Sequence, residues 1–395
     1  MDINMVIKDE NEYIIPTYKR FPVVIVKGKG SRVWDIEGKE YLDFVGGIAV
    51  NSLGHCHPLV VNAIKGQAEK LIHTSNLYYT LPQVELAKRI VELCFPGKAF
   101  FCNSGAEANE AAIKLARRFG KGRFEIICMQ NSFHGRTLAT LTATCQEKVQ
   151  KDFFPLVPGF KCVPFNDLEA IKRSISKETV GVMLEPIQSE GGVWIAEKEY
   201  LQDLRKFCDE NNLLLIFDEV ATGFGRTGKM FCYEHYEVEP DIMTLAKALG
   251  GGVAIGAMLA KKDVADFLDA GSHASTFGGN PLVCSAALAS INTISEENLV
   301  KNSENLGYYF LERLNALRER YNFIKDVRGK GLLIGVELTF KGEGIVNECL
   351  NRGVLINCIQ GNVLRFLPPL NITKEDIDKV IDTLEKVFNV SRETK

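Results

Sequence analysis

The sequence IMTLAKALGGG (residues 242–252) places one lysine, Lys247, in a short apolar run that ends in three glycines. An amine removed from water loses its proton more easily, so a desolvated lysine becomes a usable nucleophile near neutral pH. The glycines allow positive φ angles and a close approach of the backbone to a ligand. An isolated lysine more often extends from a helix to the surface. Two other segments favour the reactive interpretation.

A carboxylate, Asp218, directly follows the apolar run LLLIF at residues 213–217. The run lacks polar alternation, which is typical of a central parallel strand covered on both faces. Asp218 is therefore expected at the carboxyl end of a buried strand, where open α/β sheets bind their ligands. An unpaired buried charge is costly, and a protonated ring nitrogen would be a suitable partner. The alternative is an aspartate that caps a loop.

The segment FCNSGAEANEAAIKLARRFG (residues 101–120) indicates a strand that leads into a helix. Ser104 and Glu107 form an S-x-x-E capping box, and helical apolar periodicity begins directly after it. The N–H groups of Gly105 and Ala106 would then be free at the positive end of the helix dipole, where they can bind a phosphate. An ordinary capped helix would have the same pattern.

The three features belong to one kind of chemistry. A phosphate site, an acid for a ring nitrogen and a lysine that forms a Schiff base are what proteins contribute to reactions of pyridoxal 5'-phosphate. Their combination is much more specific than any one of them. It predicts a pyridoxal 5'-phosphate enzyme in which a substrate amine displaces Lys247 from the cofactor.

The elements that would position these residues follow an α/β pattern. Apolar runs such as KAFFCN, RFEIICM, TVGVMLEPI, NLLLIFDEV and AIGAMLA alternate with helical patterns, for example at residues 106–119 and 199–211. This alternation predicts a mainly parallel sheet with helices on both faces. A smaller α+β domain follows. We expect an N-terminal segment (1–45) packed with the small domain, a large cofactor-binding domain (46–294) and the small C-terminal domain (295–395).

Composition excludes several classes of protein. The 395 residues are 46% hydrophobic and carry a net charge of −3, which argues against partners such as nucleic acid or a membrane. The N-terminus is charged, and the eleven cysteines follow no pattern, so we expect a cytoplasmic protein with reduced thiols. The histidines of GHCHP, His55 and His57, have no third ligand nearby, so no metal site is predicted.

Nearly the whole chain resembles the class III aminotransferases, which have the pyridoxal-phosphate transferase fold of type I. The motifs that carry the resemblance are NSGAEANEAAIKLAR, NSFHGRT, EPIQSEGG, FDEVATGFGRTGK, TLAKALGGG, STFGGNPL and RFLPPL. Within that family the set is most similar to the enzymes that act on N-acetylornithine. The resemblance implies transfer of the ω-amino group of N2-acetylornithine to 2-oxoglutarate, a step of arginine biosynthesis.

The resemblance also assigns roles around the cofactor. It implies phosphate binding by Gly105 and Ala106, pairing of Asp218 with the ring nitrogen, and a Schiff base and proton transfer at Lys247. The other cofactor contacts that it implies are Phe133 and Val220 on the two ring faces, Ala221 near the phenolic oxygen, and Thr276 on the phosphate of the neighbouring subunit. The last contact implies a homodimer with shared active sites.

Recognition of the substrate would rest on charge. Arg136 can bind a carboxylate bidentately. Arg365 matches the second carboxylate arginine of the family, and Glu190 matches the acid that pairs with it when an amino-chain substrate is bound and releases it for glutamate. Ser275, beside Thr276, is expected to contact the acetylated substrate. The alternative for these charged residues is a set of surface ion pairs.

One position departs from the family pattern. Ala221 stands where the family usually has a glutamine that bonds the cofactor's phenolic oxygen, and DEVATGFGRTG is closer to diaminopelargonate aminotransferases. Other class III transaminases, acting on ornithine, succinylornithine, 4-aminobutyrate or diaminopelargonate, therefore remain alternatives. An aminomutase on the same fold and a protein that keeps the fold without this catalysis are two more, although Lys247 argues against the last.

Overall fold

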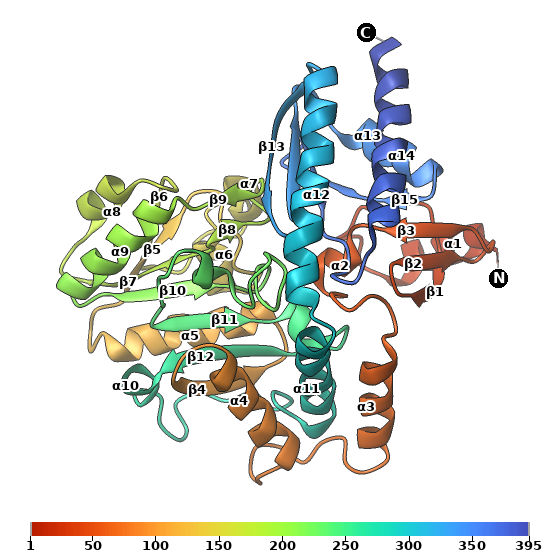
Figure 1. The fold of residues 1–395 in the computed structure, drawn as a ribbon. Helices are drawn as coiled ribbons and strands as arrows, with labels where there is room; N and C mark the ends of the chain where they lie inside the picture. The colour runs from red at the N-terminus through yellow and green to blue at the C-terminus, as the bar shows by residue number, and fades with distance from the viewer. Residues whose placement is uncertain (1, 394–395) are drawn as a thin grey trace.

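A computed structural model describes residues 2–393 and contains a central sheet of seven strands in the order β4-β12-β11-β10-β7-β5-β6 (Figure 1). The strands are β4 Gly97–Cys102, β5 Glu125–Met129, β6 Phe160–Val163, β7 Thr179–Leu184, β10 Leu214–Asp218, β11 Ile242–Leu245 and β12 Gly256–Lys261. Strands β11, β10, β7, β5 and β6 pair in parallel, whereas β12 is antiparallel to both of its neighbours. The expected mainly parallel α/β sheet is confirmed, with β12 reversed.

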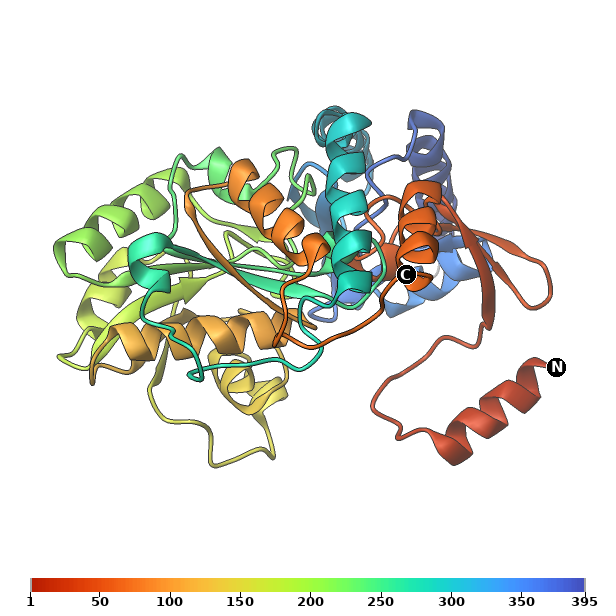
Figure 2. The same ribbon diagram turned by 90° about the horizontal axis from the view of Figure 1, so that it is seen from below.

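Helices cover both faces of this sheet, as Figure 2 shows. Strand β10 explains why, because its apolar side chains alternate between two cores. Leu214 and Ile216 pack in the cluster that contains α5 (Gly105–Phe119), whereas Leu215 and Phe217 pack in the cluster that contains α9 (Lys198–Glu210). Both faces of the strand are therefore apolar, which accounts for the unbroken run LLLIF.

The other helices of this part of the chain surround the sheet and the connections to it. They are α2 Gly46–Ala49, α3 Pro58–Ala68, α4 Leu81–Leu93, α6 Leu138–Ala143, α7 Glu147–Gln150, α8 Leu168–Ser174, α10 Lys262–Ala265 and α11 Pro281–Glu296. Two short 3-10 helices, η1 Cys232–His235 and η2 Lys247–Gly250, and the ribbon of β8 Ile187–Gln188 with β9 Trp194–Ile195 complete it.

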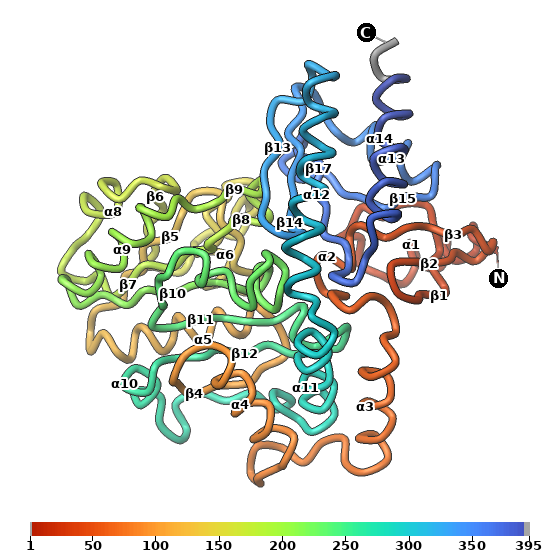
Figure 3. The backbone as a smooth tube through the Cα atoms, viewed as in Figure 1, coloured from red at the N-terminus to blue at the C-terminus, as the bar shows by residue number. Residues whose placement is uncertain are grey.

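The C-terminal part forms a second, antiparallel sheet in the order β13-β14-β17-β16. Its strands are β13 Ile324–Lys330, β14 Leu333–Leu338, β16 Asn357–Ile359 and β17 Val363–Phe366, and its helices are α12 Leu299–Arg320, α13 Glu343–Asn351 and α14 Lys374–Glu393. Figure 3 shows this part gathered at one end of the molecule. The smaller α+β unit expected from the sequence is thus present.

The N-terminal segment joins that end of the molecule. Strands β1 Ile25–Lys29, β2 Arg32–Asp35 and β3 Glu40–Asp43 form a third sheet with β15 (Val354–Leu355). Helix α1 (Ile3–Tyr13) lies apart from the body (Figure 2) and has no buried residue. The domain boundaries near residues 45 and 295 stay predictions, and residues 1, 394 and 395 of those ranges lie outside the described part of the chain.

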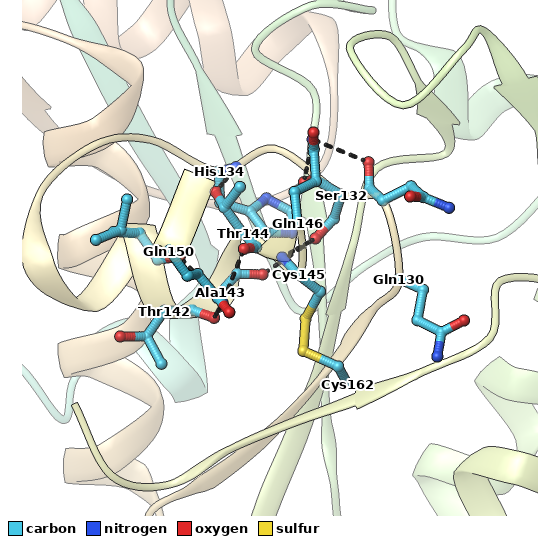
Figure 4. Close-up of a disulfide and its surroundings, with 12 residues drawn as sticks. Gln130, Ser132, His134, Thr142, Ala143, Thr144, Cys145, Gln146, Gln150 and Cys162 are labelled. Atoms are coloured by element: carbon cyan, nitrogen blue, oxygen red, sulfur yellow. Dashed lines mark hydrogen bonds between the residues drawn. A yellow bond between two sulfur atoms is a disulfide. The ribbon is translucent and has the colours of Figure 1, made fainter. Parts of the chain in front are cut away.

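The prediction that the cysteines are all reduced thiols is wrong for one pair. Cys145 and Cys162 form a disulfide, with their Cα atoms 5.9 Å apart (Figure 4). The pair arises because Cys162 lies on β6 beside β5, and Gln130, directly after β5, forms a bridge with Cys145. Spacing along the chain gave no sign of this contact. None of the described helices is long and apolar enough to cross a bilayer.

Candidate active site

The residues singled out in the sequence converge at the carboxyl ends of the parallel strands. The chain leaves β4, β5, β7, β10 and β11 there and lines a cavity of about 490 Å³. Of the predicted site residues, the cavity is lined by Gly105, Ala106, Phe133, Arg136, Glu190, Asp218, Val220, Ala221 and Lys247. A cavity of this size at this edge of an α/β sheet is a typical site for a small ligand.

Helix α5 begins at the cavity with the expected cap. Ser104 Oγ accepts a hydrogen bond from the N–H of Glu107 at 3.1 Å, but the Glu107 carboxylate returns to the N–H of Asn103 at 2.5 Å, one residue before the cap. The first N–H groups of a helix have no partner inside it, so those of Gly105 and Ala106 are available at the cavity wall. A Cβ on Gly105 would meet Val220 Cγ1 at 2.8 Å. Glycine thus lets Val220 pack directly against the helix terminus.

Asp218 ends β10 and is 4% exposed. Its Oδ1 accepts a hydrogen bond from the N–H of Val220 at 3.0 Å. Its Oδ2 lies 2.7 Å from the amide nitrogen of Asn109 and 2.8 Å from Nδ1 of His134. The sequence analysis missed both of these partners, because Asn109 is on α5 and His134 follows β5. These three hydrogen bonds fix the orientation of the carboxylate, which also lines the cavity.

Lys247 follows β11 at the start of η2 and has a φ of 44°, in the left-handed region that costs a non-glycine residue free energy. Gly251, which ends this turn, has a φ of 58°. Desolvation by the surrounding protein lowers the pKa of Lys247, against the opposing charge of Glu190. The lysine therefore has the environment that favours its neutral, nucleophilic form.

The loop after β5 brings an aromatic ring and a cation to the same wall. Phe133 is half-buried, and the guanidinium of Arg136 lies 5.7 Å from the centre of its ring. Arg136 is exposed, and within the described residues it has no carboxylate within 4.0 Å. Arg136 is thus available to bind the carboxylate of a substrate that enters the cavity.

Glu185 is a buried acid in the cavity wall that the sequence analysis did not single out. Its two oxygens accept hydrogen bonds from the N–H groups of Phe133 at 2.9 Å and Ser189 at 3.2 Å. Burial and the negative charge of Asp218 raise its pKa well above the usual value. Glu185 directly follows the buried run VGVML (residues 180–184), so the strand-end argument used for Asp218 would have found it.

Glu190 and Arg365 form an ion pair beside the cavity, with Oε1 and Nη1 2.6 Å apart. The Arg365 side chain is 1% exposed and also donates to the carbonyl and hydroxyl oxygens of Ser189. Burial opposes ionisation of Glu190, but Arg365 and Lys247 bring its pKa below the usual value. Glu190 thus stands between Arg365 and the cavity as a charged residue.

Ser275 and Thr276 do not line this cavity. Both lie at another, of about 820 Å³, together with Leu77 and Gln83. Ser275 Oγ accepts a hydrogen bond from the amide of Asn103 at 3.2 Å, and Thr276 is exposed. In this chain alone, neither residue reaches the pocket of Lys247.

The two histidines of GHCHP each lie beside an acid. His55 Nε2 lies 2.7 Å from Asp43, and His57 Nε2 lies 3.3 Å from Glu297. Among residues 2–393, no group of three or more His, Cys, Asp or Glu side chains is arranged to hold a metal ion.

Comparison with known proteins agrees with this geometry. Residues 13–388 match the family model Aminotransferase class-III. The chain is 58% identical over 386 residues to the acetylornithine aminotransferase of Methanocaldococcus jannaschii, covering 96% of each chain. An ornithine aminotransferase structure from Toxoplasma gondii, described with partial occupancy of PLP, has a TM-score of 0.94 at 34% identity, covering 99% of this chain and 95% of that one.

An acetylornithine aminotransferase structure from Elizabethkingia anophelis has a TM-score of 0.87 at 35% identity, covering 98% of this chain and 99% of that one. The chain belongs to the class III aminotransferases. It is therefore an enzyme that depends on pyridoxal 5'-phosphate and transfers amino groups.

The residues of the cavity fit this cofactor. The start of α5 suits its phosphate, and Phe133 and Val220 offer apolar surfaces for its ring. Asp218 offers a carboxylate edge for the ring nitrogen, and Lys247 a desolvated amine for attachment. When bound, pyridoxal 5'-phosphate supplies an electron sink for the substrate carbon that loses or gains a proton.

Proposed function

We propose that the enzyme transfers the ω-amino group of N2-acetylornithine to 2-oxoglutarate, giving N-acetylglutamate 5-semialdehyde and glutamate. Three relatives that share half or more of its residues, from Methanocaldococcus jannaschii, Caldanaerobacter subterraneus and Methanothermobacter thermautotrophicus, are named acetylornithine aminotransferases. The observation that carries the proposal is the ion pair of Glu190 with Arg365 beside a pocket that is also lined by Arg136, which has no carboxylate partner among the described residues. An enzyme that binds substrates with one and with two carboxylates needs a second arginine that can be neutralised. Here Glu190 neutralises Arg365, whereas Arg136 stays available.

In the first half-reaction, the single carboxylate of acetylornithine binds Arg136 while Glu190 neutralises Arg365. The acyl chain then lies among the less polar parts of the pocket, and the ω-amine reaches the position of Lys247. In the second half-reaction, the second carboxylate of 2-oxoglutarate takes Arg365 and displaces Glu190. Leaving Arg365 without any partner would be costly because it is almost fully buried.

Two groups of the chain would act on protons. The amine of Lys247 takes a proton from the amine-bearing carbon of the donor and returns one to the acceptor carbon in the second half-reaction. Asp218 holds the proton on the cofactor's ring nitrogen, so that the ring keeps its positive charge. Gly105, Ala106, Phe133 and Val220 orient the cofactor, and Ala221 leaves its phenolic oxygen without the usual glutamine.

The active unit in this proposal is a homodimer, in which Thr276 reaches the phosphate of the other subunit and Ser275 approaches the substrate. Exposed apolar side chains on this chain support the dimer. Leu77, Tyr79 and Leu81 are 83%, 100% and 77% exposed. Leu77 lines the same cavity as Ser275 and Thr276. An exposed apolar surface of this kind marks an interaction site. The cytoplasmic location remains a prediction, which cell fractionation tests.

A panel of amino donors, each assayed with 2-oxoglutarate, tests the proposed substrate. We expect acetylornithine to have the highest kcat/KM, with turnover strictly dependent on 2-oxoglutarate. Turnover of a single substrate without 2-oxoglutarate would indicate an aminomutase instead. A higher kcat/KM for succinylornithine, 4-aminobutyrate or diaminopelargonate would overturn the assignment of the donor.

Free ornithine is the second candidate donor, because similar structures include ornithine aminotransferases such as that of Toxoplasma gondii at a TM-score of 0.96. Its α-amine is positively charged, whereas acetylation makes that nitrogen neutral. The ratio of kcat/KM for acetylornithine to that for ornithine separates the two candidates, and the proposal requires a ratio above one.

A further inference from the structure

We infer that His134 is a positioning residue that orients the Asp218 carboxylate toward the cofactor's ring nitrogen. The inference rests on the proposed role of Asp218. His134 Nδ1 lies 2.8 Å from Asp218 Oδ2, and the two side chains are 0% and 4% exposed.

The two carboxylate oxygens of Asp218 have different hydrogen-bond partners. Oδ2 receives the amide N–H of Asn109 as well as the ring of His134. Oδ1 receives only the N–H of Val220 among the described residues, so it keeps a lone pair for the cavity. Because an ionised carboxylate accepts and never donates, the partner nitrogens must carry hydrogens. His134 therefore has its proton on Nδ1.

Neighbouring contacts fix the donors in this arrangement. The Thr244 hydroxyl donates to Asn109 Oδ1 at 2.6 Å, which turns the amide nitrogen of Asn109 toward Asp218. The same nitrogen donates to the carbonyl of His134 at 2.7 Å. The backbone N–H of His134 donates to the Thr144 hydroxyl at 2.8 Å, and Thr144 directly precedes the disulfide residue Cys145 (Figure 4). The protein thus orients the imidazole without any contribution from the cofactor.

The charge of His134 follows from its surroundings. Nε2 is buried and has no hydrogen-bond partner among residues 2–393. If His134 were cationic, Asp218 would have to neutralise both an imidazolium and the protonated ring nitrogen. One carboxylate would then face two buried positive charges, because burial and the charge of Asp218 raise the pKa of the neighbouring acid Glu185 and so favour its neutral form. A neutral imidazole, protonated on Nδ1 alone, orients Asp218 and leaves its negative charge for the ring nitrogen.

Nitrogen NMR of the wild-type holoenzyme, labelled with ¹⁵N in histidine, tests the tautomer directly. We expect a neutral His134 with an N–H on Nδ1 and a bare Nε2 throughout the pH range of activity. The cofactor-bound enzyme is used as it is, so the folding of variants does not enter. A neutral ring protonated on Nε2, or a cationic ring, would overturn the inference.

Matched amide substitutions test the effect on the cofactor. The amide nitrogen of His134→Asn takes the place of Nδ1, whereas that of His134→Gln extends toward the place of Nε2. The cofactor is labelled with ¹⁵N at its ring nitrogen, and the chemical shift of that nitrogen is measured. We expect His134→Asn to keep the wild-type chemical shift and His134→Gln to move it toward the value of an unprotonated ring nitrogen. Cofactor dissociation should be about 10–100-fold faster for His134→Gln, as is typical when a hydrogen bond to a charged group is lost.

Asp218→Asn separates this inference from the proposed function. If Asp218→Asn moves the ring-nitrogen shift and His134→Gln does not, His134 is only a packing residue and the inference fails. If neither variant moves it, the assignment of Asp218 to the ring nitrogen fails first. A merely structural role of His134 would lower thermal stability in both amide variants and leave the shift unchanged.

Discussion

Arg365 is almost fully buried, whereas its partner Glu190 keeps 27% of its side chain exposed. The asymmetry means that the acid can leave the pair more easily than the arginine. Glu190 lines the same cavity as Lys247 and Arg136, which come from other strands and loops. In the proposed function, these four residues select between substrates with one and with two carboxylates.

Glu190→Gln should discriminate between the two half-reactions. The amide keeps the shape of the side chain but cannot neutralise Arg365, so kcat/KM for the acetylornithine half-reaction should fall by about 10-fold or more. The glutamate half-reaction should be unchanged or faster, because no acid competes for Arg365. Single-turnover kinetics measure each half separately.

A surface acid serves as the control for this substitution. Glu169 on α8 pairs with Lys172 in solvent, so Glu169→Gln should leave both half-reactions unaltered. Equal losses in the two half-reactions of Glu190→Gln would mean that no switch exists.

The sequence allowed Lys247, Asp218 and Ser104 to be singled out because each one follows an apolar run and carries local signals of a strand end or a cap. It did not reveal that Asn109 and His134 contact Asp218. Their contacts join α5, the loop after β5 and the end of β10, which are neighbours only in the folded sheet. Periodicity along the chain holds no information on such pairs.

At the scale of elements, the segment from residue 130 to residue 146 carries much of the site and is tied to the sheet by a covalent bond. The hydroxyl of Ser132 donates to the carbonyl of Ala143, and the amide of Gln146 donates to the carbonyl of Ser132. The disulfide of Cys145 then links this segment to β6. Phe133, His134 and Arg136 all lie within it.

Removal of the disulfide in the double variant Cys145→Ser with Cys162→Ser should lower the free energy of unfolding. The cross-link closes a loop with a sequence separation of 17. A loop of that length is worth about 3 kcal/mol in the chain-entropy model. Denaturant unfolding with and without a dithiol reductant measures the difference, and the reductant should have no further effect on the double variant.

Cys56→Ser provides the control, because Cys56 is exposed and free. Titration of thiols in denatured, unreduced wild-type enzyme gives an independent check. A count equal to all eleven cysteines would contradict the disulfide.

Other elements were predictable to different degrees. Helices α5 and α9 match the predicted ranges within one residue at each end, because apolar periodicity marks both locally and a capping serine marks the start of α5. The reversed direction of β12 was not predictable, since AIGAMLA has the composition of any buried strand. Only its pairing with β11 and β4 shows the direction.

At the scale of the whole molecule, the exposed apolar residues support the proposed homodimer. Tyr79 lies just before α4 and Leu81 is its first residue, and the connection between α3 and α4 is at the opposite end of the molecule from the C-terminal sheet (Figure 1). They lie close in sequence to Leu77, which lines the cavity of Thr276. A second copy of the chain at this surface would complete the proposed site.

The double variant Tyr79→Glu with Leu81→Glu should be monomeric, because two charges in an apolar interface would be desolvated without partners. Light scattering after size-exclusion chromatography measures the mass, and the activity should fall together with the dimer. Tyr308→Glu on α12 is the control, since Tyr308 is 69% exposed on another element. A wild-type enzyme that is monomeric and fully active would contradict the shared site.

The central claim, that one pocket binds pyridoxal 5'-phosphate through Lys247, is tested most directly by trapping the attachment. The holoenzyme is reduced with borohydride, digested and analysed by mass spectrometry, with Lys247→Ala as the control. The account predicts one peptide with the mass of the reduced cofactor, carrying it on Lys247, and none in the variant, which should still bind the cofactor reversibly without turnover. Attachment at another lysine, or multiple turnovers by Lys247→Ala without added amine, would contradict the account.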